Sequence, residues 1–239
     1  MKQDSRYWDA IAPQWTTEIF NSLQSDRNRI ILTELKRAAK TAHSIADYGC
    51  GVGTYLPTLA RLFDEVQGFD HSEVCVQLAQ KRMRRKRNVS VRQSAAAPRA
   101  YRGRFDAALC VNVAINPNRR AWRCVLQSAA SLLKPEGRLI VVVPSVESGV
   151  MVAKAEGPES RPTSAGTVLM DGVPTKHYSR AELHDALTGI GMHVSRIRRV
   201  EYSWRSQSVT PPAELRHTLP WDWIAIARNT ASNANEVAA

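Results

Sequence analysis

The chain has 239 residues, of which 44% are hydrophobic, and this is enough to build one α/β domain with a substantial core. No run of apolar residues approaches the eighteen that a membrane-spanning helix needs, and the polar start MKQDSRYWDA lacks the apolar stretch of a signal peptide. The formal net charge of +11 favours polyanionic partners, either nucleic acid or an anionic membrane surface.

The four cysteines are far apart in the sequence and form no C-x-x-C pair: Cys50, Cys75, Cys110 and Cys124. This spacing is typical of reduced thiols rather than of disulfides or a zinc site. We therefore expect a cytoplasmic protein without a metal centre.

Residues 1–40 are expected to form a helical N-terminal cap. Ile30 and Leu35 belong to an apolar pattern with helical spacing. Ser25 and Asp26 precede this pattern and are candidates for capping the helix.

From residue 41 onward, short apolar strands alternate with helices. The expected strands are 43–48, 65–70, 88–93, 105–111 and 137–143, and the expected helices lie at about 54–63, 72–83 and 118–133. Strands that alternate with helices in this way predict a doubly wound parallel sheet.

The alternation is interrupted over residues 145–178, which are rich in proline and glycine and show no clear periodicity. A long excursion of this kind usually forms a lid or a binding loop, and we expect a substrate lid. A helix that starts after Ser179 follows, and then two strands at 192–204 and 221–227. The main domain is expected to span residues 41–228, and the polar tail 229–239 is expected to be disordered.

The first strand leads into the sequence IADYGCGVGT, which places Gly49, Gly51 and Gly53 at alternate positions. Glycine can adopt a positive φ and allows backbone N–H groups to approach a ligand with no Cβ in the way. At the carboxyl end of the first strand of a doubly wound sheet, such a loop predicts a nucleotide-binding crevice. Thr54 occupies the last glycine position of the dinucleotide fingerprint G-x-G-x-x-G, which argues against NAD.

The spacing D-x-G-x-G-x-G, which begins at Asp47, resembles the first motif of the class I S-adenosylmethionine (SAM)-dependent methyltransferases. Four further segments are similar to later motifs of that family and occur in the same order: FDHSEVCVQLAQKR, RFDAALCVNV, LLKPEGRLIVVVP and HYSRAELHDALTGIGMHV. The resemblance covers about residues 40–228 and points to the small-molecule branch of the family. It implies a Rossmann-like seven-stranded sheet that is mostly parallel, with an antiparallel last strand.

The resemblance also implies that the cofactor is SAM, with the glycine loop around its methionine and ribose. Asp70, at the end of the second strand, is expected to accept hydrogen bonds from the ribose hydroxyls, and Tyr7 and Trp8 are candidates to cover the cofactor. The cofactor-binding residues that the resemblance implies are Asp47, Gly49, Cys50, Gly51, Gly53, Asp70, His71, Ala95, Ala96 and Asn112.

Two positions depart from the family's pattern. Ala95 and Ala96 stand where the family has an aspartate for the adenine amino group, so we expect one hydrogen bond fewer, a loss of about 0.5–1.5 kcal/mol. Glu136 stands where the hairpin entry L-K-P-G-G has its first glycine, and Gly137 is expected to turn the chain.

Several acceptor classes are excluded by the sequence after the fourth strand. Residues 112–115 match only the first letter of the D/N-P-P-Y/F/W motif of enzymes that methylate planar amino groups. No proline precedes Cys110, as the cytosine-C5 enzymes require, and the segment has neither the carboxylate cluster of a catechol-type metal site nor the paired glutamates of the protein-arginine enzymes. His177 and Tyr178 remain as candidates for a catalytic base or a substrate ligand, and the alternative is that they pack before the following helix.

The densest basic run is KRMRRKR, residues 81–87, which is interpreted as a solvated helix end because no aromatic residues are interleaved with it. The leading hypothesis is a SAM-dependent methyltransferase with a small-molecule acceptor. Two alternatives stay open: an RNA methyltransferase, favoured by the net charge, and a SAM-binding protein without turnover, favoured by the missing adenine aspartate. The acceptor atom and the oligomeric state do not follow from the sequence.

Overall fold

The structure, a computed structural model, describes residues 5–15, 19–156, 166–170 and 173–230. Most of the tail expected to be disordered, and part of the expected lid, therefore lie outside the described residues.

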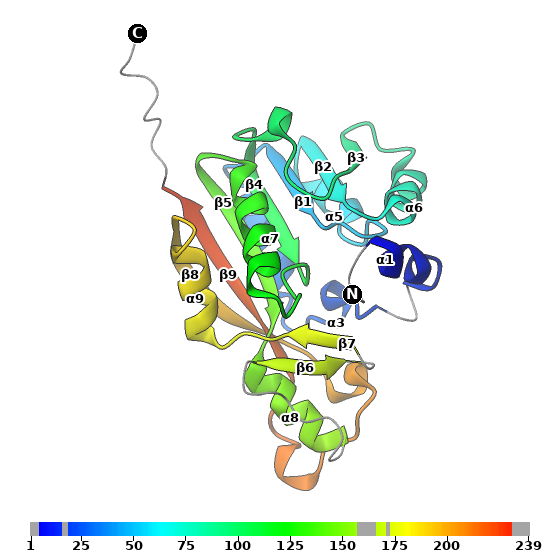
Figure 1. Cartoon of the computed structure of the whole chain (residues 1–239), viewed down its shortest axis with the longest axis vertical. Coiled ribbons are helices and arrows are strands. Elements are labelled where there is room, and N and C mark those ends of the chain that lie inside the picture. Colours follow the sequence, from blue (N-terminus) through cyan, green and yellow to red (C-terminus); the bar gives the residue numbers. More distant parts are fainter. Residues whose placement is uncertain (1–4, 16–18, 157–165, 171–172, 231–239) are drawn as a thin grey trace.

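A seven-stranded sheet forms the centre of the molecule, in the order β3-β2-β1-β4-β5-β9-β8 (Figure 1). The strands are β1 (Ser44–Tyr48), β2 (Glu65–Asp70), β3 (Val89–Gln93), β4 (Phe105–Val111), β5 (Leu133–Pro144), β8 (Met192–Glu201) and β9 (Trp221–Asn229). The first five strands pair in parallel, whereas β9 is antiparallel to both β5 and β8. The expected α/β fold, with a mostly parallel sheet and an antiparallel last strand, is confirmed.

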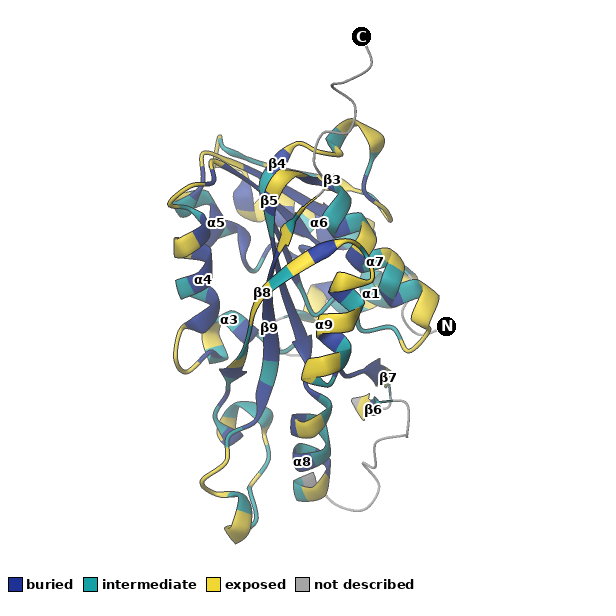
Figure 2. Cartoon of the chain, turned by 90° about the vertical axis from the view of Figure 1, so that its left-hand side faces the viewer, coloured by how far each residue is buried: buried dark blue, intermediate teal, exposed yellow. Residues whose placement is uncertain are grey.

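Helices cover both faces of this sheet (Figure 2). Helices α4 (Ile30–Ala38), α5 (Leu56–Leu62) and α6 (Glu73–Met83) bury their apolar side chains in one core cluster. Helices α7 (Arg119–Ser131) and α9 (Arg180–Thr188) contribute to the cluster on the opposite face. Strands β1 and β5 lie between the two layers, which explains why they read as nearly continuous apolar runs.

Side-chain caps fix where the helices begin. The hydroxyl of Ser72 accepts a hydrogen bond from the backbone N–H of Cys75 at the start of α6, and Ser179 caps α9 in the same way. Asp26, one of the two predicted caps, accepts from the N–H of Ile31 in the first turn of α4.

The N-terminal part of the chain forms α1 (Ser5–Ile11), η1 (Ala12–Gln14) and α3 (Ser22–Ser25) ahead of α4. Helix α1 packs against α6 and places the N-terminal residues beside the carboxyl ends of β1 and β2.

The excursion after β5 contains regular structure that the sequence analysis did not assign. It forms α8 (Val146–Glu156) and a small antiparallel sheet of β6 (Thr167–Met170) and β7 (Val173–Lys176). The apolar residues Val150, Met151 and Val152 of α8 are consecutive, so no clear helical period is visible in its sequence.

Two further features were not predicted: the backbone at Glu136 in β5 and the connection between β3 and β4. Where a turn was expected at Gly137, the left-handed residue is Glu136, which has a φ of +61° within β5. Between β3 and β4 the chain forms only the short 3-10 helix η2 (Arg99–Tyr101), so no α-helix covers that part of the sheet within residues 94–104. The 3-10 helices η3 (Trp204–Gln207) and η4 (Ala213–Leu215) lie in the connection from β8 to β9.

A carboxylate at the amino ends of the strands generates a pH-dependent contribution to stability. Asp106 accepts hydrogen bonds from the backbone N–H groups of His43 and Ser44 and lies 2.6 Å from the Lys134 ammonium. Although burial opposes it, the hydrogen bonds from Lys134 and Ser44 lower the pKa of Asp106 to about 2.

We expect Asp106→Asn to lower the free energy of unfolding at pH 7 by about 1–2 kcal/mol, after allowance for screening of a partly exposed group. A carboxyl group whose pKa is lowered by folding stabilises the fold when the pH lies above its pKa in the unfolded chain, near 4. This stabilisation is lost as the pH falls towards 2. Urea titrations at pH 7 and pH 3 should therefore show the gap between variant and wild type shrinking at the lower pH. A gap that is equal at both pH values would contradict this assignment.

Candidate functional site

The glycine loop lies at the carboxyl end of β1 and has the backbone that the sequence indicated. Gly49, Gly51 and Gly53 all have positive φ, at +78°, +53° and +80°. The N–H groups of Gly49 and Cys50 donate to the carbonyl of Phe69, so the loop is fastened to the end of β2. A left-handed conformation at three alternate positions explains why the sequence uses glycine there.

Asp70 connects this loop to helix α6. Its side chain is only 8% exposed, and its two oxygens accept from the N–H of Gly51, at 2.8 Å, and from the N–H of Ser72, at 2.9 Å. Burial raises the pKa of Asp70 above its ordinary value, although these two hydrogen bonds favour the ionised form. The carboxylate therefore fixes the position of the loop relative to the first turn of α6.

Asp47, next to the loop on β1, is 2% exposed, and its Oδ2 atom has no hydrogen-bond partner. Burial and the neighbouring Asp70 raise the pKa of Asp47 to about 8. Two other polar atoms at this edge of the sheet are also buried without a partner, the hydroxyl of Tyr55 and the Oδ1 atom of Asn112. Unpaired buried polar atoms are costly, so this cluster is chemically suited to a ligand that brings both donors and acceptors.

Residues of the N-terminal segment lie on the glycine loop. The indole of Trp15 lies over Gly51, where a Cβ added to that glycine would come within 2.5 Å of the ring. Asp9 of α1 accepts from the Ser72 hydroxyl at 2.5 Å and from the N–H of Val74, which fixes α1 to the start of α6. Trp8 packs against the ring of Trp15, with 5.9 Å between the ring centres, and Tyr7 lies edge-on to Trp8. The expectation that Tyr7 and Trp8 cover the cofactor stays a prediction.

The remaining residues expected to bind the cofactor differ in how far they are buried. Cys50 lies within the glycine loop and is buried, with its sulfur beside Gly68 and 3.6 Å from the carbonyl oxygen of Gly51. His71 follows Asp70 and has a buried, unpartnered Nε2 atom. Ala95 and Ala96 are exposed in the segment after β3.

His177 and Tyr178 are both buried, beside the segment that follows β4. The Tyr178 hydroxyl donates to the carbonyl of Ala114 at 2.5 Å, and burial raises its pKa above the ordinary value. His177 is 4% exposed, with Nδ1 at 3.1 Å from the carbonyl of Thr175, and its ring lies against Gly149 of α8. These contacts show that the pair connects α8 and β7 to the end of β4.

One acidic group at this edge was missed by the sequence analysis. Asp222 on β9 accepts from the Tyr202 hydroxyl at 2.8 Å and also interacts with Asn112, and burial raises its pKa to about 6. The sequence feature that could have indicated this acid is its place between two tryptophans, in Trp221-Asp222-Trp223; both tryptophans are buried in the structure.

Within the described residues, no group of three or more His, Cys, Asp or Glu side chains is arranged to hold a metal ion. In the same part of the chain, no helix is long and apolar enough to cross a membrane.

His177 makes the free energy of unfolding depend on pH in a second range. Burial lowers its pKa to about 4, so the folded protein resists protonation between about pH 6.5 and pH 4 while the unfolded chain takes up the proton. The free energy of unfolding should therefore fall as the pH drops through this window, by up to about 1.4 kcal/mol per pH unit.

We expect the His177→Gln variant to show a flatter dependence on pH in denaturant titrations between pH 6.5 and 4.5. His193→Gln, at an exposed position of β8, is the matched control and should keep the slope of the wild type. Equal slopes in the wild type and His177→Gln would show that His177 is not the group responsible.

Comparisons with known proteins agree with this geometry. Residues 45–137 match the family model described as "Methyltransferase domain". A search of the curated proteins finds no match. Among solved structures, a SAM-dependent methyltransferase from Methanosarcina mazei has 16% identity and a TM-score of 0.60, with 79% of this chain and 93% of that chain covered.

Two other solved structures match along nearly their whole length. The DhpI–SAH complex has 18% identity and a TM-score of 0.63, with 96% of each chain covered. The [4+2]-cyclase SpnF has 16% identity and a TM-score of 0.67, with 95% of this chain and 96% of that chain covered. Taken with the glycine loop and the sheet order, these findings show that the chain has the fold of these proteins and that residues 45–137 match a methyltransferase domain.

Proposed function

We propose that this protein binds SAM at the carboxyl edge of its sheet and transfers the methyl group to a small-molecule acceptor. The observation that carries the proposal is the buried carboxylate pair of Asp47 and Asp70 beside three left-handed glycines. One oxygen of this pair, Oδ2 of Asp47, has no partner within the protein.

The polar groups of SAM fit the residues at this edge. Its ribose hydroxyls and its α-amino group are donors, and Asp70 and Asp47 offer acceptors. Each oxygen of Asp70 accepts one backbone N–H, and a carboxylate oxygen has capacity for a further donor. A donor placed on Asp47 would remove the cost of an unpaired buried acceptor. Ala95 and Ala96 leave the adenine to backbone contacts.

The chain needs few groups for the chemistry itself. When bound, SAM supplies a methyl group on a positively charged sulfur that is already activated for in-line displacement. The protein's residues then have to position the acceptor, exclude water and take up a proton where the acceptor carries one. We assign Trp15 to shielding, because its ring lies on the glycine loop.

Two side chains are candidates for the proton acceptor. Asp222, whose pKa is about 6, is largely ionised at neutral pH and interacts with Asn112 at the end of β4. His177, whose pKa is about 4, is neutral at pH 7 and has its Nδ1 atom engaged by a backbone carbonyl. The hydroxyl of Tyr178 is committed to the carbonyl of Ala114, so we assign this residue to positioning the segment after β4.

We further propose that residues 145–178 cover the acceptor, within a domain of residues 41–228 and beneath the N-terminal cap 1–40. The N–H of Lys176 at the end of β7 donates to the carbonyl of Ile115 in the segment after β4, and the N–H of Tyr178 donates to the carbonyl of Pro144 at the end of β5. Leu169 on β6 is 48% exposed and offers apolar surface on this cover.

A SAM-binding protein without turnover is the second candidate, and the two alanines in place of the adenine aspartate favour it. All four cysteines are free, which supports a reducing compartment, and we propose the cytoplasm. Mass spectrometry of molecules that co-purify with the protein would identify an acceptor. Incubation of that molecule with SAM and the protein would separate turnover from binding alone.

We expect Asp70→Asn to weaken SAM binding by about 1.5–3 kcal/mol, because the ribose hydroxyls lose a charged acceptor. Isothermal titration calorimetry on folded protein measures this loss. Asp64→Asn, an exposed position just before β2, is the matched control and should bind SAM as the wild type does. An Asp70→Asn variant with wild-type affinity would remove Asp70 from the site.

A further inference from the structure

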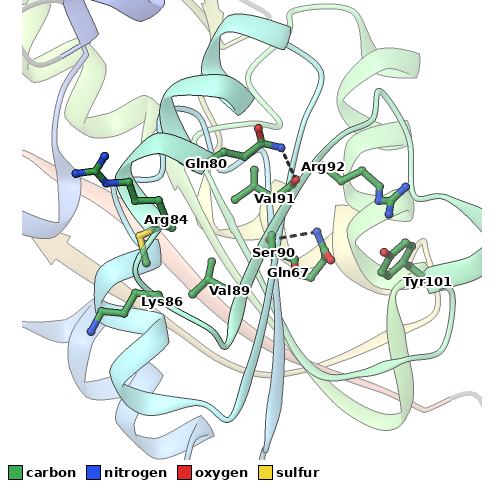
Figure 3. Close-up of a pocket in the computed structure, with 10 residues that line it drawn as sticks. Gln67, Gln80, Arg84, Lys86, Val89, Ser90, Val91, Arg92 and Tyr101 are labelled. Atoms are coloured by element: carbon green, nitrogen blue, oxygen red, sulfur yellow. Dashed lines mark hydrogen bonds between the residues drawn. The ribbon is translucent and has the colours of Figure 1, made fainter.

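A groove runs along the outer strand β3, away from the glycine loop (Figure 3). Its volume is about 400 Å³, and its lining residues come from α6, the segment that follows α6, β2, β3 and η2. They are Gln67, Gln80, Met83, Arg84, Lys86, Val89, Ser90, Val91, Arg92 and Tyr101. The groove is open because no α-helix covers this edge of the sheet within the segment between β3 and β4.

The lining is basic and contains no acidic residue. Figure 3 shows Arg84 and Lys86 at one end of the groove and Arg92 at the other. No ion pair involves these three side chains among the described residues, and all three are exposed. Residues 89–93 between the two ends span about 13 Å at the usual rise of a strand. A single small anion cannot reach both ends, but a chain of phosphates can.

An aromatic ring that no local sequence pattern predicts completes the groove. Tyr101 is about 15 residues beyond the basic run 81–87, yet the fold brings its ring beside Arg92, whose guanidinium lies 5.6 Å from the ring centre. Arg104 lies 5.3 Å from the same ring. An aromatic ring flanked by arginines next to a basic groove is the combination on which single-stranded nucleic acids bind, through stacking and phosphate contacts.

A peptide strand is a poorer occupant of the same edge. Strand addition needs free carbonyl and N–H groups along the outer side of β3. The carbonyl of Val91, in the middle of that side, already accepts from the Gln80 amide at 3.0 Å. The positive charges would also repel the edge of a second copy of this chain.

We propose that the groove binds single-stranded nucleic acid. The backbone phosphates lie on Arg84, Lys86 and Arg92, and one base stacks against Tyr101. This site is separate from the carboxylate pair of the glycine loop, and it does not depend on the identity of the methyl acceptor.

Fluorescence anisotropy of a labelled, mixed-sequence 12-nucleotide single-stranded RNA tests the proposal with the full chain at 50, 100 and 200 mM NaCl. The variant Arg84→Gln/Lys86→Gln/Arg92→Gln should raise the Kd at least tenfold at 50 mM NaCl. It should also reduce the slope of log K against log salt by about two units, because three phosphate contacts on a single strand are lost.

The control variant Lys36→Gln/Lys40→Gln/Arg216→Gln removes the same charge from exposed positions outside the groove and should change the Kd less than about threefold. Tyr101→Leu should weaken binding several-fold without changing the salt slope, whereas Tyr101→Phe should bind as the wild type does. Melting curves establish that each variant is folded.

Three results would overturn the proposal. The first is a wild type that fails to bind the RNA at 50 mM NaCl, and the second is an equal loss in the two triple variants. The third is a groove variant that keeps its affinity but self-associates, which would show that the charges only protect the edge strand.

Discussion

The structure of the site depends on one carboxylate. Asp70 accepts from the N–H of Gly51 in the loop and from the N–H of Ser72 at the start of α6, and Ser72 in turn donates its hydroxyl to Asp9. Three segments that are distant in sequence, the N-terminal helix, the glycine loop and α6, are thereby fixed around one buried charge. The loop must then hold positive φ at alternate positions to present its N–H to that charge, which is why its glycines cannot be exchanged freely.

Burial opposes the ionisation of the neighbouring Asp47, and the charge of Asp70 adds to this effect. Asp47 has no partner for one oxygen and lies close enough to Asp70 for the two carboxyls to oppose each other's ionisation. A neutral acid and an ionised acid can therefore coexist at the edge of the sheet, with the proton on Asp47. A positively charged ligand would reverse that preference and release the proton. The buried carboxyl pair costs the fold stability and is suited to a ligand with cationic and hydroxyl groups.

The strands, the helix caps at Ser72 and Ser179 and the glycine loop could be predicted because their signals are local: apolar runs, a hydroxyl before a helix and glycines at fixed spacing. Helix α8 was missed because its neighbours in the fold, rather than an apolar stripe, stabilise it. That Trp15 lies on the glycine loop could not be predicted, since which tryptophan reaches the loop depends on how α1 docks on α6. Tyr101 and Asp222 acquire their surroundings only through long-range strand pairing, which a single sequence does not reveal.

The position of β9 has a consequence for how this protein is made. It is the last of the described strands in chain order, yet it lies between β5 and β8. During synthesis, the five parallel strands and their helices emerge first. The apolar strand β5 then has no hydrogen-bonded partner on the side that β9 occupies in the folded protein. Strand β8 emerges next but has no place in the sheet until β9 leaves the ribosome. The nascent chain therefore carries an unpaired, aggregation-prone edge until residues 221–229 arrive, and chaperone binding would protect it during that interval.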